Sequence, residues 1–264
     1  MAWGASVNAY IHPGWRSTLI DNGLTGFDAF WNMDLPLLDT PNTSRGGFSS
    51  VARMDLKGND TTQRTLIIKR QQNHNSRTWR HPLKGLPTTQ KEFANILRFK
   101  RRDLETVTPV FFARRRVVDG DQAILATAYL EGYLSLEDFL RQWIATPKTD
   151  LVAKRRVLRL TAKWVRRMHH AGFQHNCLYT KHIFVNPKDS RVPVRGIDLE
   201  KVRWQIRATK RWRHDLSSLF RRTAGLSRTD RLCFLQHYFG ADMVNPEVRR
   251  AWHRIHQAMA RKKS

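Results

Sequence analysis

Cysteine is scarce in this chain of 264 residues, and long apolar runs are missing. The two cysteines, Cys177 and Cys233, are too few for the disulfide framework of a small secreted domain, so we expect a reduced, cytoplasmic chain. No run approaches the about 18 consecutive apolar residues that a membrane-spanning helix needs. The first residues, MAWGASVNAY, do not lead from a basic segment into an apolar one, which predicts no secretory signal.

Acidic residues are also few. The chain has 22 Asp and Glu against 47 Lys and Arg, which gives a formal net charge of +25. This excess predicts an anionic partner: a nucleic acid, a phosphorylated glycolipid or an acidic membrane face. A hydrophobic content of 41% excludes a disordered basic tail and allows one large domain or two lobes. Basic clusters are spread along the chain, at 98–102, 114–116, 154–156, 207–213 and 261–263.

The first part of the chain, to about residue 125, is predicted to contain short strands and one helix. Residues 48–56 and 65–69 predict the strands of a hairpin, because each run is apolar or alternating and glycine turns flank them. Residues 71–87, rich in Asn, Arg and Pro, predict a loop. A helix is predicted from 88 to about 102, and a buried strand over 122–130.

The remainder is predicted to be mainly helical. A helix is expected to begin near Ser135, and a longer one to run from Leu151 to His170, where apolar residues recur at steps of three and four. Gly172 follows this helix at the position of a left-handed cap. Most of the rest of its surface is basic, as in a solvated helix face or an anion-binding surface.

A glycine turn at Gly46 and Gly47 precedes the first predicted strand. Glycine lacks Cβ, so its backbone N–H groups can approach phosphate oxygens. The alternative is an ordinary hairpin turn, and the full spacing of a G-x-G-x-x-G motif is missing.

Lys69 closes the apolar run of the second strand, where a lysine can reach the phosphates of a nucleotide; otherwise it only ends the strand. Glu92, on the following helix, is placed to pair with Lys69. Thr89 and Glu92 also have the spacing of a capping box, and both readings are compatible with the sequence.

The segment AYLEGYLSLEDFL links the strand-rich part to the helical part. Tyr129 and Glu131 stand in this link, where exposed backbone can bind an adenine ring. Further on, Asp198 follows a predicted strand pair, 183–185 and 194–197. A carboxylate there can hold magnesium, with His175 and His182 from the preceding loop orienting it or joining the site. The competing reading of Asp198 is a turn residue.

These signals, in this order, resemble the protein-kinase-like fold, and more narrowly the InaA-type branch of the lipopolysaccharide kinase (Kdo/WaaP) family. Residues 175–182, HNCLYTKH, are similar to the kinase catalytic loop H-R-D-L-x-x-x-N, and Ile197-Asp198-Leu199 stands in place of D-F-G. The segment 214–219, HDLSSL, resembles the helix whose aspartate, here Asp215, braces that loop. The resemblance covers about residues 46–215.

The resemblance implies an α+β, bilobal protein-kinase-like fold. Its N-lobe (1–130) would be a small antiparallel sheet and its C-lobe (131–264) mainly helical. It further implies ATP and Mg²⁺ as cofactors. Lys69 and Glu92 would serve the nucleotide, together with Gly46, Gly47, Tyr129 and Glu131, while Asp198 and His182 would hold the metal and His175 would belong to the catalytic loop.

The sequence departs from the family pattern at Cys177, which stands where kinases place the aspartate that accepts the acceptor's proton. A thiol of ordinary pKa is mostly protonated at neutral pH and is a poor replacement for a carboxylate. Such a base contributes roughly 10²–10⁴-fold, whereas positioning and charge neutralisation carry most of phosphoryl transfer. Cys177 has two further readings, a small apolar filler or a reactive thiol, and Glu200 is a further candidate carboxylate.

Three hypotheses of function follow. The first is an ATP-dependent kinase acting on a sugar hydroxyl of lipopolysaccharide core or a similar anionic glycoconjugate, in the cytoplasm and in possible peripheral contact with the anionic inner membrane. The second is a pseudokinase that works as a regulatory scaffold. The third, least favoured, is a nucleic-acid-binding module in which Trp204 or Trp212 stacks on bases.

Overall fold

The computed structural model describes residues 9–43, 47–57, 63–78, 81–145, 150–189, 193–223 and 225–261. They fall into two compact units. Unit 1 takes residues up to 97 together with 107–130, and unit 2 takes 98–106 together with 131 onward.

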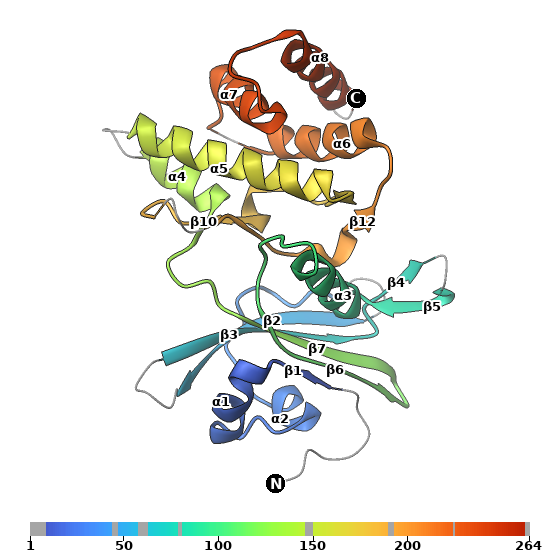
Figure 1. The fold of residues 1–264 in the computed structure, drawn as a ribbon. Coiled ribbons are helices and arrows are strands. Elements are labelled where there is room, and N and C mark those ends of the chain that lie inside the picture. The colour runs from blue at the N-terminus through green and yellow to red at the C-terminus, as the bar shows by residue number, and fades with distance from the viewer. Residues whose placement is uncertain are drawn as a thin grey trace. The chain divides into compact units, whose positions relative to one another are not determined.

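Unit 1 is built on a five-stranded antiparallel sheet of strand order β1-β6-β7-β3-β2. Figure 1 shows the short helices on one face of this sheet and α3 on the other. A separate hairpin pairs two further strands. The elements are β1 (Tyr10–Ile11), η1 (Pro13–Trp15), α1 (Arg16–Asp21), α2 (Phe27–Trp31), β2 (Phe48–Lys57), β3 (Gln63–Gln72), β4 (Asn75–Thr78), β5 (His81–Pro87), α3 (Thr88–Lys100), β6 (Pro109–Val117) and β7 (Gly120–Ala128).

Neighbouring side chains of β6 serve opposite faces of the sheet, because successive residues of a strand point in opposite directions. Phe111 stacks on Phe30 of α2, with ring centroids 4.2 Å apart, in the main core of unit 1. Phe112 stacks on Phe93 of α3 at 4.4 Å. The alternation of one strand therefore fixes both α2 and α3 against the sheet.

Two predictions for unit 1 are wrong. Residues 71–87 are not a loop: β3 continues to Gln72, and β4 and β5 form a hairpin. The prolines of β5 stand at its second residue, Pro82, and at its end, Pro87, so the interior of the strand keeps its N–H donors. Besides the one predicted helix, unit 1 contains α1 and α2, which were not predicted. With six and five residues, these helices are too short to show a helical period.

Unit 2 is mainly helical, with five short strands among the helices. β10 pairs with β8 and β11, and β9 pairs with β12, all antiparallel. The elements are β8 (Leu134–Ser135), α4 (Leu136–Ala145), α5 (Leu151–His170), β9 (Phe173–Gln174), η3 (Thr180–His182), β10 (Ile183–Val185), β11 (Arg195–Gly196), η4 (Leu199–Lys201), β12 (Arg203–Trp204), α6 (Ala208–Arg221), α7 (Arg228–Phe239) and α8 (Pro246–Ala260).

The long helix α5 has the predicted bounds. Asp150 caps its start by accepting the N–H groups of Val152 and Ala153 at 2.9 and 3.0 Å. Gly172 ends it with a φ of +89°, and a Cβ there would lie 2.5 Å from the ring of Trp204, so both backbone conformation and space require glycine. In the part of the chain that the structure describes, no helix combines the length and apolar character needed to cross a membrane.

Candidate functional site

Lys69 and Glu92 form an ion pair in unit 1. Lys69 lies on β3, and its Nζ is 2.8 Å from both carboxylate oxygens of Glu92 on α3. The Glu92 side chain is only 6% exposed and that of Lys69 is 23% exposed, so the carboxylate is shielded while the ammonium group stays partly accessible. The sheet and the helix thus hold a cation in one place, as a phosphate-binding lysine requires.

The capping-box prediction for Thr89 and Glu92 is wrong. Thr89 lies inside α3, and its hydroxyl has no hydrogen-bond partner among the described residues. Gln71 of β3 serves the helix start instead: its Oε1 accepts the Thr89 N–H at 2.9 Å, and its Nε2 donates to the Thr88 hydroxyl at 2.7 Å. Only the tertiary fold brings Gln71 there.

The glycine turn is described only in part, because Gly46 lies outside the described residues. A Cβ on Gly47 would lie 2.1 Å from the carbonyl oxygen of Gln72, so glycine is required where the chain crosses the end of β3. This packing accounts for Gly47 without a ligand, and its role towards phosphate stays a prediction.

Tyr129 and Glu131 occupy the predicted link. The backbone N–H of Tyr129 donates to the Thr65 carbonyl at 2.9 Å, and its ring lies 4.8 Å from the Arg53 guanidinium carbon, all within unit 1. That N–H is therefore committed to the sheet. Glu131 is exposed in unit 2, directly before Gly132, whose φ is +74°.

Asp215 of α6 is a buried carboxylate in unit 2. It holds the backbone of residues 175–182, called the catalytic-like loop below. Its Oδ2 accepts the His175 N–H at 2.7 Å and its Oδ1 accepts the Asn176 N–H at 3.0 Å. His169 of α5 donates from Nε2 to Oδ2 at 3.1 Å. Burial alone would raise the pKa of Asp215, but hydrogen bonds from His169 and His214 prevail and hold it well below its ordinary range.

His175 lies fully buried beneath the loop. Its Nε2 donates to the carbonyl of Ile197 at 3.2 Å, and its Nδ1 has no partner among the described residues. Burial lowers the pKa of His175 despite the nearby Asp215, so the ring is neutral at pH 7. The ring therefore positions Ile197, the residue directly before Asp198, rather than exchanging a proton at the surface.

His182 and Asp198 meet at the end of this loop, with Nε2 3.3 Å from Oδ2. The opposite ring nitrogen of His182, Nδ1, donates to the Cys177 carbonyl at 2.9 Å, which turns the Nε2 lone pair of a neutral ring towards the Asp198 carboxylate. Two electron-rich atoms facing each other require a proton or a metal ion between them. Asp198 also adopts a left-handed φ of +56°, a conformation that Asn73, Asp103 and Asn176 share and that aspartate and asparagine tolerate better than most residues, so this feature also fits a turn residue.

The donor set fits a magnesium ion that also uses ligands from outside the chain. No cluster of three or more His, Cys, Asp or Glu side chains suited to a metal occurs among the described residues. Mg²⁺ is commonly held by one or two carboxylates, with substrate phosphates and waters completing its shell. Asp198 matches that pattern, whereas the imidazole of His182 is a nitrogen donor, which Mg²⁺ binds less readily than oxygen.

Cys177 is 6% exposed and is surrounded by polar groups. Burial raises the pKa of Tyr179, and a hydrogen bond and charge interaction with Cys177 raise it further. Burial lowers the pKa of Lys201, but the charge interactions with Cys177 and Glu200 and a hydrogen bond to Cys177 outweigh this and raise it. The thiol thus contacts a phenol and an ammonium group.

Sequence reasoning missed Tyr179 and Lys201 as members of this site. Tyr179 lies inside the catalytic-like loop, and Lys201 directly follows Glu200, whose Oε1 is 3.7 Å from the Lys201 ammonium. Tyr179 lies in the segment that resembles the catalytic loop, and Lys201 follows the segment that contains Asp198. Their closeness in sequence to these segments was the only signal that could have found them. The two tryptophans considered for base stacking pack edge-on against Phe173 and Phe239, at 5.8 Å each, and Trp204 is 56% exposed, so base stacking stays a prediction.

Comparisons with known proteins show which sequences and structures this chain resembles. The model of the lipopolysaccharide kinase (Kdo/WaaP) family matches residues 28–238. Protein InaA of Escherichia coli (strain K12) is 29% identical over 194 residues, 73% of this chain and 86% of that protein. Lipopolysaccharide core heptose(I) kinase WaaP of the same strain is 28% identical over 211 residues, 77% of this chain and 76% of that protein.

A solved structure described as WaaP in complex with acyl carrier protein has the same fold. Its TM-score is 0.66 at 24% sequence identity, and the match covers 97% of both chains. The predicted α+β, protein-kinase-like fold is confirmed.

Proposed function

This chain belongs to the lipopolysaccharide kinase (Kdo/WaaP) family, as its motifs predicted, and on that premise we propose that it is an ATP-dependent kinase acting on a sugar hydroxyl of lipopolysaccharide core or a similar anionic glycoconjugate. The observation that carries the proposal is the Lys69–Glu92 ion pair, because a shielded carboxylate holding a partly exposed lysine on a strand is an arrangement suited to ATP phosphates.

Each unit contributes a separate part of the proposed chemistry. Lys69 would neutralise charge on the ATP phosphates. Asp198 and His182 would hold Mg²⁺, which supplies further charge neutralisation when bound. His175 and Asp215 hold the backbone that carries these groups. In the transfer, the acceptor oxygen bonds to the γ-phosphorus, the bond to the bridging oxygen breaks, and ADP leaves.

The acceptor hydroxyl must also lose its proton, and Cys177 stands where a carboxylate base is usual. Lys201 and Tyr179 beside the thiol are proton donors rather than bases at neutral pH. In this proposal the proton passes to solvent water, and charge neutralisation supports most of the rate. We expect turnover to be slower than with a carboxylate base by about 10²–10⁴-fold.

Thermal denaturation with and without Mg·ATP tests the nucleotide site. We expect Mg·ATP to raise the melting temperature of the wild type and to leave Asp198→Ala unshifted. Transfer of labelled γ-phosphate to a core oligosaccharide tests the acceptor. A wild type that Mg·ATP does not stabilise contradicts the nucleotide site, and a stabilised protein without transfer to any core oligosaccharide contradicts the acceptor assignment.

A second candidate, a pseudokinase serving as a regulatory scaffold, is favoured by the buried thiol at the base position. Cys177→Asp distinguishes the two: ATP turnover that appears only in the variant supports the scaffold, whereas turnover in the wild type excludes it.

For location, we propose the cytoplasm with peripheral contact to the anionic inner membrane, since the net charge is +25. Cell fractionation at low and at high salt tests this location. A chain recovered only in the soluble fraction at both salt concentrations contradicts the membrane contact.

A further inference from the structure

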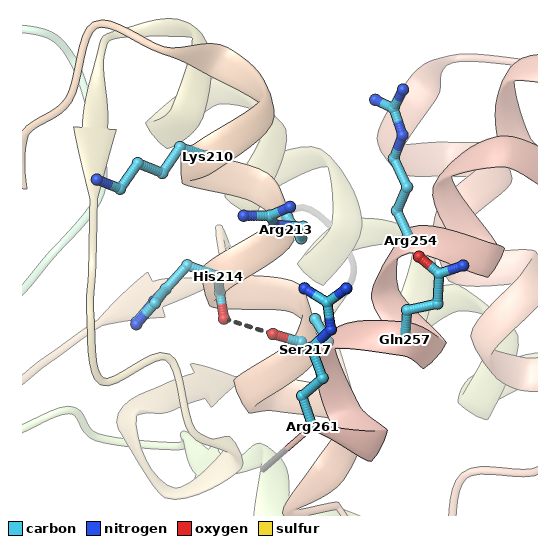
Figure 2. A pocket seen from close by; sticks show the side chains of 8 residues that line it. Lys210, Arg213, His214, Ser217, Arg254, Gln257 and Arg261 are labelled. Atoms are coloured by element: carbon cyan, nitrogen blue, oxygen red, sulfur yellow. Dashed lines mark hydrogen bonds between the residues drawn. The ribbon is translucent and has the colours of Figure 1, made fainter.

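A basic groove runs between α6 and α8 in unit 2, with a volume of about 250 Å³. Figure 2 shows the side chains that line it, contributed by both helices. The lining residues of α6 stand at helical steps of three and four, so one face of that helix forms one wall. The other wall consists of α8 and of Arg261, which follows α8 as its C-cap. The residues used below are Lys210, Arg213, His214, Ser217, Arg254 and Arg261.

The groove has an uncompensated positive charge. Four of its lining residues are Lys or Arg, and none of its lining residues carries a carboxylate. In the described part of the chain, Lys210, Arg213 and Arg254 have no acidic partner, and all three are exposed. Elsewhere in unit 2, cations do find carboxylates, as Lys154 finds Asp230 at 2.6 Å and Arg167 finds Glu105 at 2.6 Å. Arg159 and Lys163 on α5 are likewise exposed cations, but they stand on one helix, whereas the cations of the groove come from two segments around a cavity.

The lining residues also provide a fixed surface and directional hydrogen-bond donors in addition to charge. Ser217 is buried, and its hydroxyl donates to the His214 carbonyl at 3.0 Å, which fixes the floor of the groove on α6 (Figure 2). Arginine presents a planar fork of donors that matches phosphate oxygens. Three arginines and a lysine around a cavity of this size suit a compact head group, since pockets for larger ligands have about 300–1,000 Å³.

We propose that this groove binds a ligand carrying two phosphomonoester groups. A phosphomonoester has a charge of about −1.5 to −2 at pH 7, so two of them are comparable in charge to Lys210, Arg213 and Arg254 together. Such a ligand can be a soluble sugar bisphosphate or the head group of a phosphorylated lipid, which share this chemistry. The proposal does not require the chain to be a kinase, because no residue of the groove belongs to the nucleotide or metal groups described above.

The groove adjoins the carboxylate that holds the catalytic-like loop. His214 lines the groove, and its Nδ1 donates to Oδ1 of Asp215 at 3.2 Å. The same Oδ1 accepts the Asn176 N–H. A bound anion is thus separated from the loop by one side chain and one carboxylate.

Titration calorimetry with glucose 1,6-bisphosphate and sedimentation with vesicles that contain phosphatidylinositol 4,5-bisphosphate, whose head group carries two phosphomonoesters, test the proposal. The double variant Arg213→Gln, Arg254→Gln removes one cation from each wall. Its control, Arg159→Gln, Lys163→Gln, removes two exposed cations from one face of α5 and changes the net charge equally. We expect the groove variant to lose at least tenfold in affinity and the control to bind like the wild type.

The two probes separate the two sources. Binding of the sugar bisphosphate alone assigns a soluble ligand, and binding of the phosphatidylinositol 4,5-bisphosphate vesicles alone assigns a lipid head group. Either result supports the groove if the groove variant loses that binding. Failure of the wild type to bind either probe overturns the proposal, as does equal loss in the control pair. Loss of binding in Lys69→Met with retention in the groove variant also overturns it, because the probe then occupies the nucleotide site.

Discussion

The carboxylate of Asp215 and the imidazole of His169 meet at 3.1 Å in the buried interior of unit 2. Asp215 is fully buried, and it accepts two backbone N–H groups of the loop that precedes Cys177. A helix residue thereby fixes the loop backbone through charge-assisted hydrogen bonds, which are about twice as strong as neutral ones.

Asp215→Ala is expected to lower the free energy of unfolding by about 3–5 kcal/mol, because it leaves buried donors and a histidine without their acceptor. Denaturant unfolding measures the loss. Asp242→Ala, at an exposed carboxylate, serves as the control and should change stability by no more than about 0.5 kcal/mol. Equal effects of the two substitutions would contradict the bracing role.

The buried His175 predicts that stability falls as the pH is lowered from 7 to 5. Its pKa is lowered in the folded chain, so below the unfolded value of about 6.5 the unfolded state binds a proton that the folded state does not. The wild type should lose up to about 2 kcal/mol at pH 5 through this one group. Unfolding curves at several pH values should show a shallower dependence for His175→Gln; an unchanged slope would contradict this account.

Lys69→Met and Glu92→Gln are each expected to weaken stabilisation by Mg·ATP, the first by removing the cation and the second by releasing it. Because both act on one ion pair, the double variant should lose less than the sum of the two. Thermal shifts titrated with Mg·ATP provide the measurement. Strict additivity would show that Glu92 does not act through Lys69.

Gly172→Ala is expected to destabilise the chain more than two matched controls. Gly172 has both a left-handed φ and the Trp204 ring in the Cβ position, whereas Gly23 has a φ of +73° with open space, and Gly26 has an extended backbone with open space. A left-handed alanine costs about 1–2 kcal/mol. Unfolding free energies should therefore rank Gly172→Ala below Gly23→Ala, and Gly26→Ala nearest the wild type.

Much of the fold followed from the sequence, since apolar periodicity and glycine placement are local. The bounds of α5 and the paired strands before Asp198 follow from patterns within a few residues, whereas the helix carrying Asp215 was expected only from the resemblance of residues 214–219 to the family. The β4–β5 hairpin was missed because its polar residues lack alternation. The short helices α1 and α2 are held by their packing on the sheet rather than by propensity.

The site was less accessible to sequence reasoning wherever the partner is distant along the chain. Gln71 at the start of α3, Tyr179 and Lys201 beside Cys177, and the tautomer of His182 all depend on tertiary contacts. Residue identity gives the chemistry of such groups, but only the folded chain says which of them meet.

The contact between Lys69 and Glu92 is made by the chain's own side chains and is part of the fold of unit 1. A lysine side chain free to rotate loses about 1.5–2 kcal/mol of rotamer entropy when it is fixed. Here that ordering has taken place during folding, so an incoming anion meets a cation that is already immobile. Such preorganisation favours tight binding over adaptability. Because α3 carries Glu92 and the sheet carries Lys69, a change in the packing of α3 on the sheet is expected to change the affinity for the anion.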